Sequence, residues 1–284
     1  MDSMKRMEKL RDLDFQASAG PAGKLLYDQY RELNYVDVLP DTDLYRIFSF
    51  RRLLESIKNQ RLTLVRPVSW KDPYENFLLN ASGRLSDGTP ISFAPVRDLF
   101  YGQCWTLRKE CDGLWKAVSA KSIGAKVKTK ASKLMNYFYD TTHEFHSLSY
   151  FIGLVSYLPD SDIHKYFSNK LDWIFGGGDQ GMNLIYTLLT KREAFDYEKE
   201  VRLIFRLPNN DDIDLSKVTN PWRKNSRLFH FRIDPNDVFE QIVFSPDVKQ
   251  NDFNICSAKL KSAGYTGQIL RSDLYDKPNF VATI

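Results

Sequence analysis

The spacing of hydrophobic and polar residues divides the chain into short strands and helices. Runs rich in β-branched and aromatic residues, bounded by Pro, Gly or polar residues, predict strands. They lie at 43–48, 61–66, 101–107, 123–129, 151–157, 195–205, 227–233, 241–244 and 267–270. Helical periodicity predicts helices at 1–14, 24–33, 50–59, 131–145 and 252–263. Strands and helices do not alternate regularly, so the pattern favours the α+β class over a doubly wound α/β fold.

A break in this pattern suggests how the chain is organised. The segment 17–23 is rich in Ala and Gly and contains Pro21, and it separates two helical patterns. We therefore expect residues 1–42 to form a helical N-terminal arm that packs on a single main domain, 43–284. Within that domain, 161–192 has the composition of a helical insertion.

The predicted strand 195–205 has an unusual distribution of charge. Alternate side chains of a strand point to opposite faces. One face carries Tyr197, Lys199, Val201, Leu203 and Phe205, and the other carries Glu198, Glu200, Arg202 and Ile204. Buried charges must be paired or solvated, so the second face suits either a cleft or an exposed surface. The pattern alone leaves both interpretations open.

Composition narrows the class of protein. At 43% hydrophobic residues the chain can bury a substantial core, and three cysteines without a Cys-x-x-Cys pair argue against a disulfide scaffold or a structural zinc site. The pair His143 and His146 lacks the spacing of a metalloprotease motif, so no metal is expected. Without an apolar run of membrane-spanning length or a signal peptide, we expect a cytoplasmic protein with no membrane partner.

The basic residues leave a nucleic-acid partner open. The net charge is +4, which permits RNA, DNA or an acidic protein as a partner without requiring one. Lysines are frequent between Lys116 and Lys133, and Trp222 lies beside Arg223 and Lys224. Cations beside an aromatic ring suit single-stranded nucleic acid, although a solvated surface is the ordinary interpretation of such runs.

Five motifs in order resemble a widespread bacterial family that is known as a conserved domain of unknown function. The chain's motifs are Leu44-Tyr45-Arg46; Ser69 to Glu75, similar to "sFNDPFE"; Cys104-Trp105-Thr106 with Leu114 to Ser119, similar to "CFS…MWahYa"; Phe195 to Phe205, similar to "FxYEkEwRlif"; and Gln241 to Pro246 with Arg271 to Tyr275. The resemblance covers roughly residues 44–275. It departs from the family at Lys71, where the family has Asn, and at Ala117-Val118, where it has His-Tyr.

That family looks like a distant branch of the ADP-ribosyltransferase superfamily. The shared order would be an arginine on an early strand, a Ser/Thr on a middle strand and a late Glu-x-Glu, here Arg46, Thr106 and Glu198/Glu200. The resemblance implies a split β-sheet core with peripheral helices and NAD as co-substrate. It also implies an NAD-dependent ADP-ribosyltransferase, as a bacterial toxin or anti-phage effector that modifies nucleic acid or protein, with an antitoxin protein as a further partner.

The chemistry of NAD cleavage gives each residue an expected role. Breaking the nicotinamide–ribose bond creates an oxocarbenium-like transition state that carboxylates stabilise. Glu200 is expected to bind the ribose 2′-hydroxyl, Glu198 to orient or deprotonate the acceptor and Arg46 to bind the pyrophosphate. Thr106 is expected to hydrogen-bond Glu200. The candidates for stacking on nicotinamide or adenine are Trp70, Tyr74 and Trp115.

Two other functions remain open on the sequence. The first is a module with the same fold that binds RNA or protein without catalysis. The second is a Mg²⁺-dependent nuclease that uses Asp72 and Glu75 together with Glu198 and Glu200. For Asp72 the simpler expectation is a helix-start role, with Pro73 at the first helical position.

Overall fold

The computed structural model describes residues 3–18, 24–70, 72–84, 87–119, 122–142, 146–169, 174, 180–208 and 227–278. Its strands are β1 (Tyr35–Val36), β2 (Asp43–Ser49), β3 (Arg61–Val65), β4 (Ser82–Arg84), β5 (Pro90–Ser92), β6 (Phe100–Thr106), β7 (Gly124–Lys130), β8 (Tyr150–Leu154), β9 (Ser156–Leu158), β10 (Thr190–Arg192), β11 (Glu200–Arg206), β12 (Leu228–Arg232), β13 (Gln241–Phe244) and β14 (Gln268–Arg271).

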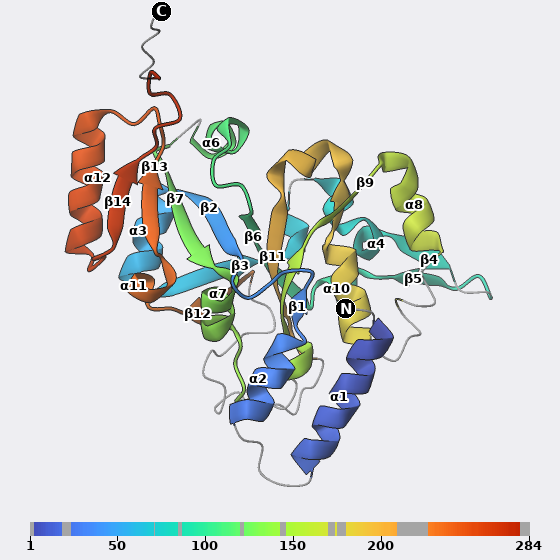
Figure 1. The fold of residues 1–284 in the computed structure, drawn as a ribbon. Helices are drawn as coiled ribbons and strands as arrows, with labels where there is room; N and C mark the ends of the chain where they lie inside the picture. The colour runs from blue at the N-terminus through green and yellow to red at the C-terminus, as the bar shows by residue number, and fades with distance from the viewer. Residues whose placement is uncertain are drawn as a thin grey trace, which may run out of the picture.

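The helices flank these strands (Figure 1). The α-helices are α1 (Ser3–Ser18), α2 (Lys24–Glu32), α3 (Phe50–Lys58), α4 (Phe77–Asn80), α5 (Ala94–Arg97), α6 (Asp112–Ser119), α7 (Ala131–Phe138), α8 (Asp160–Ser168), α10 (Gln180–Leu188), α11 (Pro235–Val238) and α12 (Gln250–Ser262). The 3-10 helices are η1 (Pro67–Ser69), η2 (Pro73–Asn76), η3 (His146–Leu148) and η4 (Glu193–Glu198).

The main sheet divides at one edge of β6. Its principal order is β1-β8-β11-β6-β2-β7-β13-β14, with β3 and β12 as a branch from β6. On the dividing edge, Thr106 pairs with Tyr45 of β2 while Gly102 pairs with Val65 of β3. The two partners therefore diverge along β6, and α3, which connects them, spans the opening. The α+β class, with a divided sheet and peripheral helices, is confirmed.

The two faces of β11 lie in different hydrophobic clusters, as the alternation predicts. Val201, Leu203 and Phe205 pack in the larger cluster with α3, α7 and α12. Ile204 packs in the smaller cluster, which includes Leu184 and other residues of α10. Because both faces are covered, Glu200 and Arg202 enter the interior with Ile204 instead of facing solvent.

The N-terminal helices are joined to the sheet through a buried arginine. Arg6 of α1 is fully buried and donates to the side chain of Asn34 at 2.8 Å and to the carbonyl of Leu33 at 3.2 Å. Strand β1 then pairs in parallel with β8. The division into an arm, 1–42, and a domain stays a prediction. No helix in the described part of the chain is long and apolar enough to cross a membrane.

Several predicted elements have different bounds in the structure. The strand predicted at 195–205 begins only at Glu200, because Glu193–Glu198 forms a 3-10 helix and Lys199 has a positive φ of 41°. The helix predicted at 131–145 ends at Phe138. The helix predicted at 252–263 is present as α12, and Gly264 follows it with a φ of +94°, which favours glycine.

Gly102 of β6 allows an aromatic ring to lie directly on the sheet. A Cβ at this position would be 2.5 Å from Cζ2 of Trp70. We expect Gly102→Ala to lower the free energy of unfolding by about 1–3 kcal/mol, because neither the ring nor the strand can move freely. Urea unfolding measures this. Gly113→Ala is the control, since its Cβ would meet Cys111 Sγ at 3.9 Å, an ordinary contact; equal losses in both variants would contradict the argument.

Candidate active site

One cavity contains four of the residues that the sequence singles out. It has a volume of about 260 Å³, and its lining includes Arg46, Thr106, Glu198 and Glu200. They come from β2, from β6 and from the segment that joins η4 to β11. We call this the acid cavity. Its position at the dividing edge of β6 explains how residues far apart in the sequence meet.

A left-handed residue sets the relation between the two acids. Glu198 ends η4 and Glu200 begins β11, so they do not share one strand as expected. Lys199 lies between them with a φ of 41° and a ψ of 59°, a conformation that is unfavourable for residues other than glycine. The turn nevertheless leaves both carboxylates near one ammonium group, that of Lys191.

Thr106 holds the backbone of this turn and not the carboxylate of Glu200. Its hydroxyl donates to the carbonyl of Glu198 and accepts from the backbone amide of Arg108 at 3.0 Å. The expected hydrogen bond to Glu200 was therefore wrong. The pairing of Thr106 with Glu200 across β6 and β11 explains this, because it places the hydroxyl beside the turn.

Glu200 is held by two cations in the interior. Arg202 donates to both of its carboxylate oxygens, at 2.9 and 3.0 Å, and Lys191 Nζ lies 3.2 Å from Oε2. The residue is 2% exposed. The same two cations also bind Glu75, with Arg202 at 2.9 Å and Lys191 at 2.8 Å from Oε1.

The surroundings drive the pKa values of the two acids apart. Burial alone would raise the pKa of Glu200, but Arg202 and Lys191 outweigh it and hold that pKa at about 2. Burial raises the pKa of Glu198 above its ordinary value, although Lys191 opposes this at 2.6 Å. A pair of acids with diverging pKa values fits a division between a permanently charged group and a proton acceptor.

The buried cluster also has an excess of negative charge. Three carboxylates, those of Glu75, Glu198 and Glu200, face the two cations Lys191 and Arg202. Within this cluster one negative charge is formally left over at the wall of the acid cavity, and the guanidinium of Arg46, which lines the same cavity, interacts with Glu200. A fixed negative charge in a poorly solvated site stabilises a positive charge that develops beside it.

Arg46 lies in the opening between β2 and β3. Its guanidinium donates to the carbonyl of Cys104, at the point where β6 has no ladder partner on that edge. Its Nε is buried and has no hydrogen-bond partner among the described residues. Burial lowers the pKa of the guanidinium, which still leaves it charged at neutral pH. Arg46 thus has a structural role and brings a positive charge to the cavity lining.

The three aromatic residues predicted to stack on NAD each face a cation of the protein instead. The guanidinium of Arg202 lies 4.3 Å from the centre of the Trp70 ring, and that of Arg192 lies 4.6 Å from the Tyr74 ring. Trp115 is 2% exposed, with Lys126 Nζ 5.3 Å from its ring. For Trp115 the prediction is therefore corrected: the ring is a buried packing residue.

Lys191 is the site residue that the sequence did not indicate. It lies on β10, which pairs in parallel with β9 and also contacts η2 and η4, the elements that carry Glu75 and Glu198. For Asp72 and Glu75 the sequence offers a metal role and, for Asp72, a helix-start role. They are three residues apart at η2, and residues at that spacing in a 3-10 helix lie on one side. Asp72 also accepts from the amide of Tyr74 at 3.1 Å, which confirms its helix-start role.

The departure from the family pattern falls inside the acid cavity. Ala117 and Val118 line it together with Leu114, so the wall opposite the acids is apolar. The thiol of Cys104 also lines the cavity, and burial raises its pKa, so it stays protonated at neutral pH. Neither an imidazole nor a thiolate nucleophile is supplied from these positions.

The acids considered for Mg²⁺ are already engaged. Asp72 forms an ion pair with Arg192 at 2.9 Å, and Glu75 is bound by Arg202 and Lys191. Among the described residues, no group of three or more His, Cys, Asp or Glu side chains is arranged to hold a metal ion. His143 and the basic group Trp222 to Lys224 lie outside the described residues.

Comparison with known proteins gives a distant likeness. No family model matches the chain, and no curated protein matches it. It is similar to Thermus sp. 2.9 DarT in complex with NAD+, with a TM-score of 0.37, 10% identity, and coverage of 83% of this chain and 97% of that one. For DarT in complex with ADP-ribosylated ssDNA the TM-score is 0.38 at 9% identity, with 83% and 96% covered. Similarity at this level does not assign a function to the chain.

The depressed pKa of Glu200 predicts sensitivity to acid. Its folded pKa of about 2 lies below the ordinary 4.5, so the stabilisation is fully present above about pH 5 and is lost as pH falls towards 2. The shift corresponds to about 3 kcal/mol. Urea unfolding between pH 3 and 7 should show a smaller fall in stability for Glu200→Gln than for the wild type. Glu193→Gln, at an exposed position of η4, is the control and should keep the wild-type profile.

Removal of Lys191 should destabilise the protein. In Lys191→Met the three carboxylates would keep Arg202 as their cation within the cluster. Removing one partner of a buried ion pair lowers the free energy of unfolding by about 3–5 kcal/mol. Urea unfolding at pH 7 measures the change. Lys165→Met, on an exposed position of α8, provides the comparison. A loss no larger in Lys191→Met than in Lys165→Met would show that the ammonium does not hold the acids.

Proposed function

We propose that the protein is an NAD-dependent ADP-ribosyltransferase whose catalytic centre is the acid cavity. The observation that carries the proposal is the meeting of Arg46, Glu198 and Glu200 in one cavity. Composition and spacing alone left a cleft and an exposed face equally open, and the burial of Glu200 supports the cleft.

The two acids have separate parts in the reaction. The bond between C1′ of the ribose and the nicotinamide nitrogen breaks, and its electron pair leaves with nicotinamide. Positive charge then develops on the ribose, and the permanently ionised Glu200 stabilises it. The acceptor forms its bond to C1′ and gives its proton to Glu198, whose raised pKa suits a base.

Other residues of the cavity position the reactants. Arg46 supplies a positive charge for the pyrophosphate, and Thr106 fixes the turn that carries Glu198. Leu114, Ala117 and Val118 offer an apolar wall for the nicotinamide ring. We propose a nucleic acid or a protein side chain as acceptor, and a toxin or anti-phage effector as the biological context, in which an antitoxin protein would neutralise it.

A non-catalytic binding module is the second candidate. The observation that favours it is the engagement of both Glu200 oxygens by Arg202, with Lys191 on one of them, at 2% exposure. A carboxylate that is bound in this way resembles one partner of an ion pair that serves only to stabilise the fold. Calorimetry that detects RNA binding without NAD binding would select this candidate. The Mg²⁺ nuclease is not favoured, because its four acids are paired with lysine or arginine.

Transfer from labelled NAD tests the proposal. The protein is incubated with NAD labelled in its adenylate part and with cell lysate, and the nucleic-acid and protein fractions are then separated and counted. We expect Glu198→Gln and Glu200→Gln each to lower the rate of transfer by about 10²-fold or more. The fraction that carries the label identifies the acceptor class.

The control variant also loses one carboxylate, but at a position outside the acid cavity. Glu193→Gln removes one carboxylate from the same 3-10 helix at an exposed position and should transfer at the wild-type rate. Thermal unfolding of each variant separates lost chemistry from lost folding, which matters because Glu200 also binds Arg202. Transfer at the wild-type rate by both Glu198→Gln and Glu200→Gln would contradict the proposed function.

A further inference from the structure

A second cavity lies in the opening of the divided sheet, on the other side of β2 from the acids. It has a volume of about 330 Å³ and is lined from β2, α3, β3, β6 and β12. Alternation along β2 separates the two cavities, since Phe48 lines this one while Tyr45 and Ile47 line the acid cavity. Arg46 lines both. We call the second one the fork cavity.

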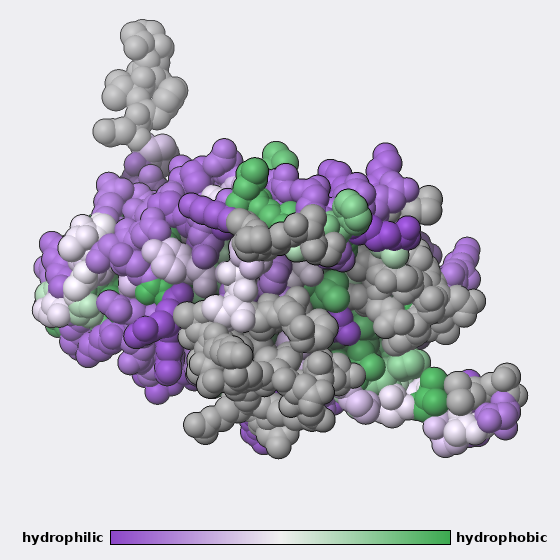
Figure 2. Space-filling view, turned by 90° about the horizontal axis from the view of Figure 1, so that it is seen from below, coloured by the Kyte–Doolittle hydropathy of each residue, from purple (hydrophilic) through white to green (hydrophobic). Residues whose placement is uncertain are grey.

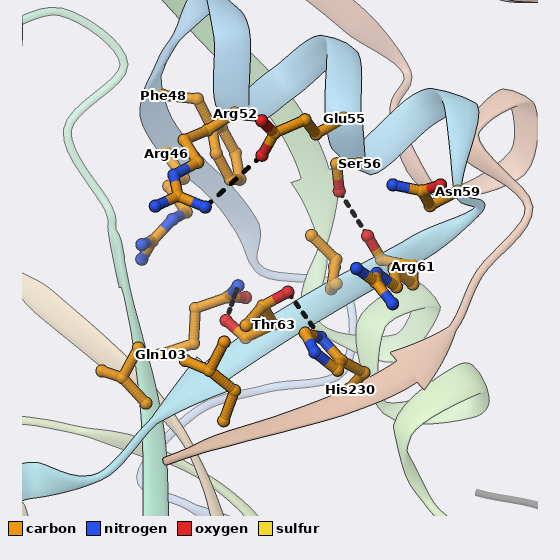
Figure 3. A pocket seen from close by; sticks show the side chains of 13 residues that line it. Arg46, Phe48, Arg52, Glu55, Ser56, Asn59, Arg61, Thr63, Gln103 and His230 are labelled. Atoms are coloured by element: carbon orange, nitrogen blue, oxygen red, sulfur yellow. Dashed lines mark hydrogen bonds and ion pairs between the residues drawn. The ribbon is translucent and has the colours of Figure 1, made fainter. Parts of the chain in front are cut away.

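The fork cavity has a strongly positive lining. Figure 3 shows Arg46, Arg52 and Arg61 around the same space. Glu55 is the single acid of the lining, and it is 3.4 Å from Arg52 Nη1 in a pair whose members are 66% and 47% exposed. Exposed pairs of this kind bind weakly. Three guanidinium groups against one carboxylate therefore attract an anion, and a planar guanidinium fork matches a phosphate.

Two polar side chains of this wall are held differently by the protein. Gln103 is satisfied, because its amide donates to the Thr63 carbonyl at 2.9 Å and its oxygen accepts from Trp105 at 2.9 Å. The Nε of Arg46 is buried, and no described residue accepts a hydrogen bond from it, whereas such groups are ordinarily satisfied. Gln103 is thus a fixed part of the wall, while Arg46 contributes its positive charge to the lining.

The rest of the lining suits an aromatic heterocycle. Phe48, Leu62 and Leu228 provide apolar surface. His230 is held by Thr63, with Nδ1 and Oγ1 2.8 Å apart, and burial lowers its pKa, with Arg61 adding to the effect. The imidazole is therefore neutral at pH 7 and offers a flat ring. Guanidinium groups beside a flat, largely apolar surface match the two halves of a nucleotide.

We infer that the fork cavity binds a phosphate-bearing nucleotide, with the phosphate at Arg46, Arg52 and Arg61 and the base between Phe48, Leu228 and His230. Two molecules carry this chemistry: the adenylate half of NAD and a nucleotide of a nucleic-acid strand. The site does not depend on the proposed transfer reaction, because binding requires neither acid. A nucleotide there lies beside Arg46, which also borders the acid cavity.

Calorimetry with AMP, adenosine, NAD and a short single-stranded DNA oligonucleotide tests this site. We expect AMP to bind at least tenfold more tightly than adenosine, because only AMP carries the phosphate. Arg52→Gln and Arg61→Gln should each weaken AMP binding by about tenfold. Loss of NAD affinity in the same variants identifies the co-substrate as the natural ligand, and loss of oligonucleotide affinity identifies the strand.

Arg51→Gln is the matched control. Arg51 neighbours Arg52 on α3, carries the same charge and is 77% exposed, but does not line the cavity. It should change AMP affinity less than twofold. Two results would overturn the inference. One is an equal loss of AMP affinity in Arg51→Gln and Arg61→Gln, and the other is that the wild type binds none of AMP, NAD and the oligonucleotide. If nucleotides bind as expected but no transfer from NAD is detected, only the proposed function is contradicted.

Discussion

The ion pair between Arg202 and Glu200 is the interaction on which the rest of the site depends. Arg202 is fully buried, and a buried guanidinium is tolerated only when its donors and its charge are matched. Glu200 and Glu75 match the charge, and the carbonyl of Leu188 accepts a further hydrogen bond. The ring of Trp70 covers the guanidinium, and this ring can lie on the sheet because Gly102 has no side chain. One strand residue thus ties together η2, α10 and β11.

The same buried cluster connects residues from separate parts of the chain. Figure 1 shows α10 and α4 beside β11 on one side of the molecule, while α3 and α12 lie on the other. Figure 2 shows hydrophilic surface interrupted by hydrophobic patches on the face seen from below. Inside this shell Lys191 binds three acids from two segments, η2 and the turn at Lys199. Their positions are therefore coupled, and a change in one alters the charge balance at the others.

The sequence pattern correctly predicted those elements whose conformation depends on neighbouring residues in the chain. The strand at 241–244, the helix that Gly264 ends and the two faces of β11 followed from periodicity and turn chemistry. The left-handed turn did not, because a lysine at position 199 gives no sign of a positive φ. Nor could Lys191 be found, since the tertiary contacts of β10 with β9, η2 and η4 bring it to the acids. The stacking role of Trp115 failed because its burial depends on tertiary packing.

The cluster is hard to explain by stability alone. Replacing a buried ion network with apolar residues of similar size often leaves a protein equally or more stable. This cluster also adjoins a residue, Lys199, in an unfavourable backbone conformation. Backbone strain and clusters of buried charge are both concentrated at functional sites, where the surrounding structure holds them in place. Their coincidence at the wall of a cavity that Arg46 also lines is therefore better explained by ligand chemistry than by the demands of folding.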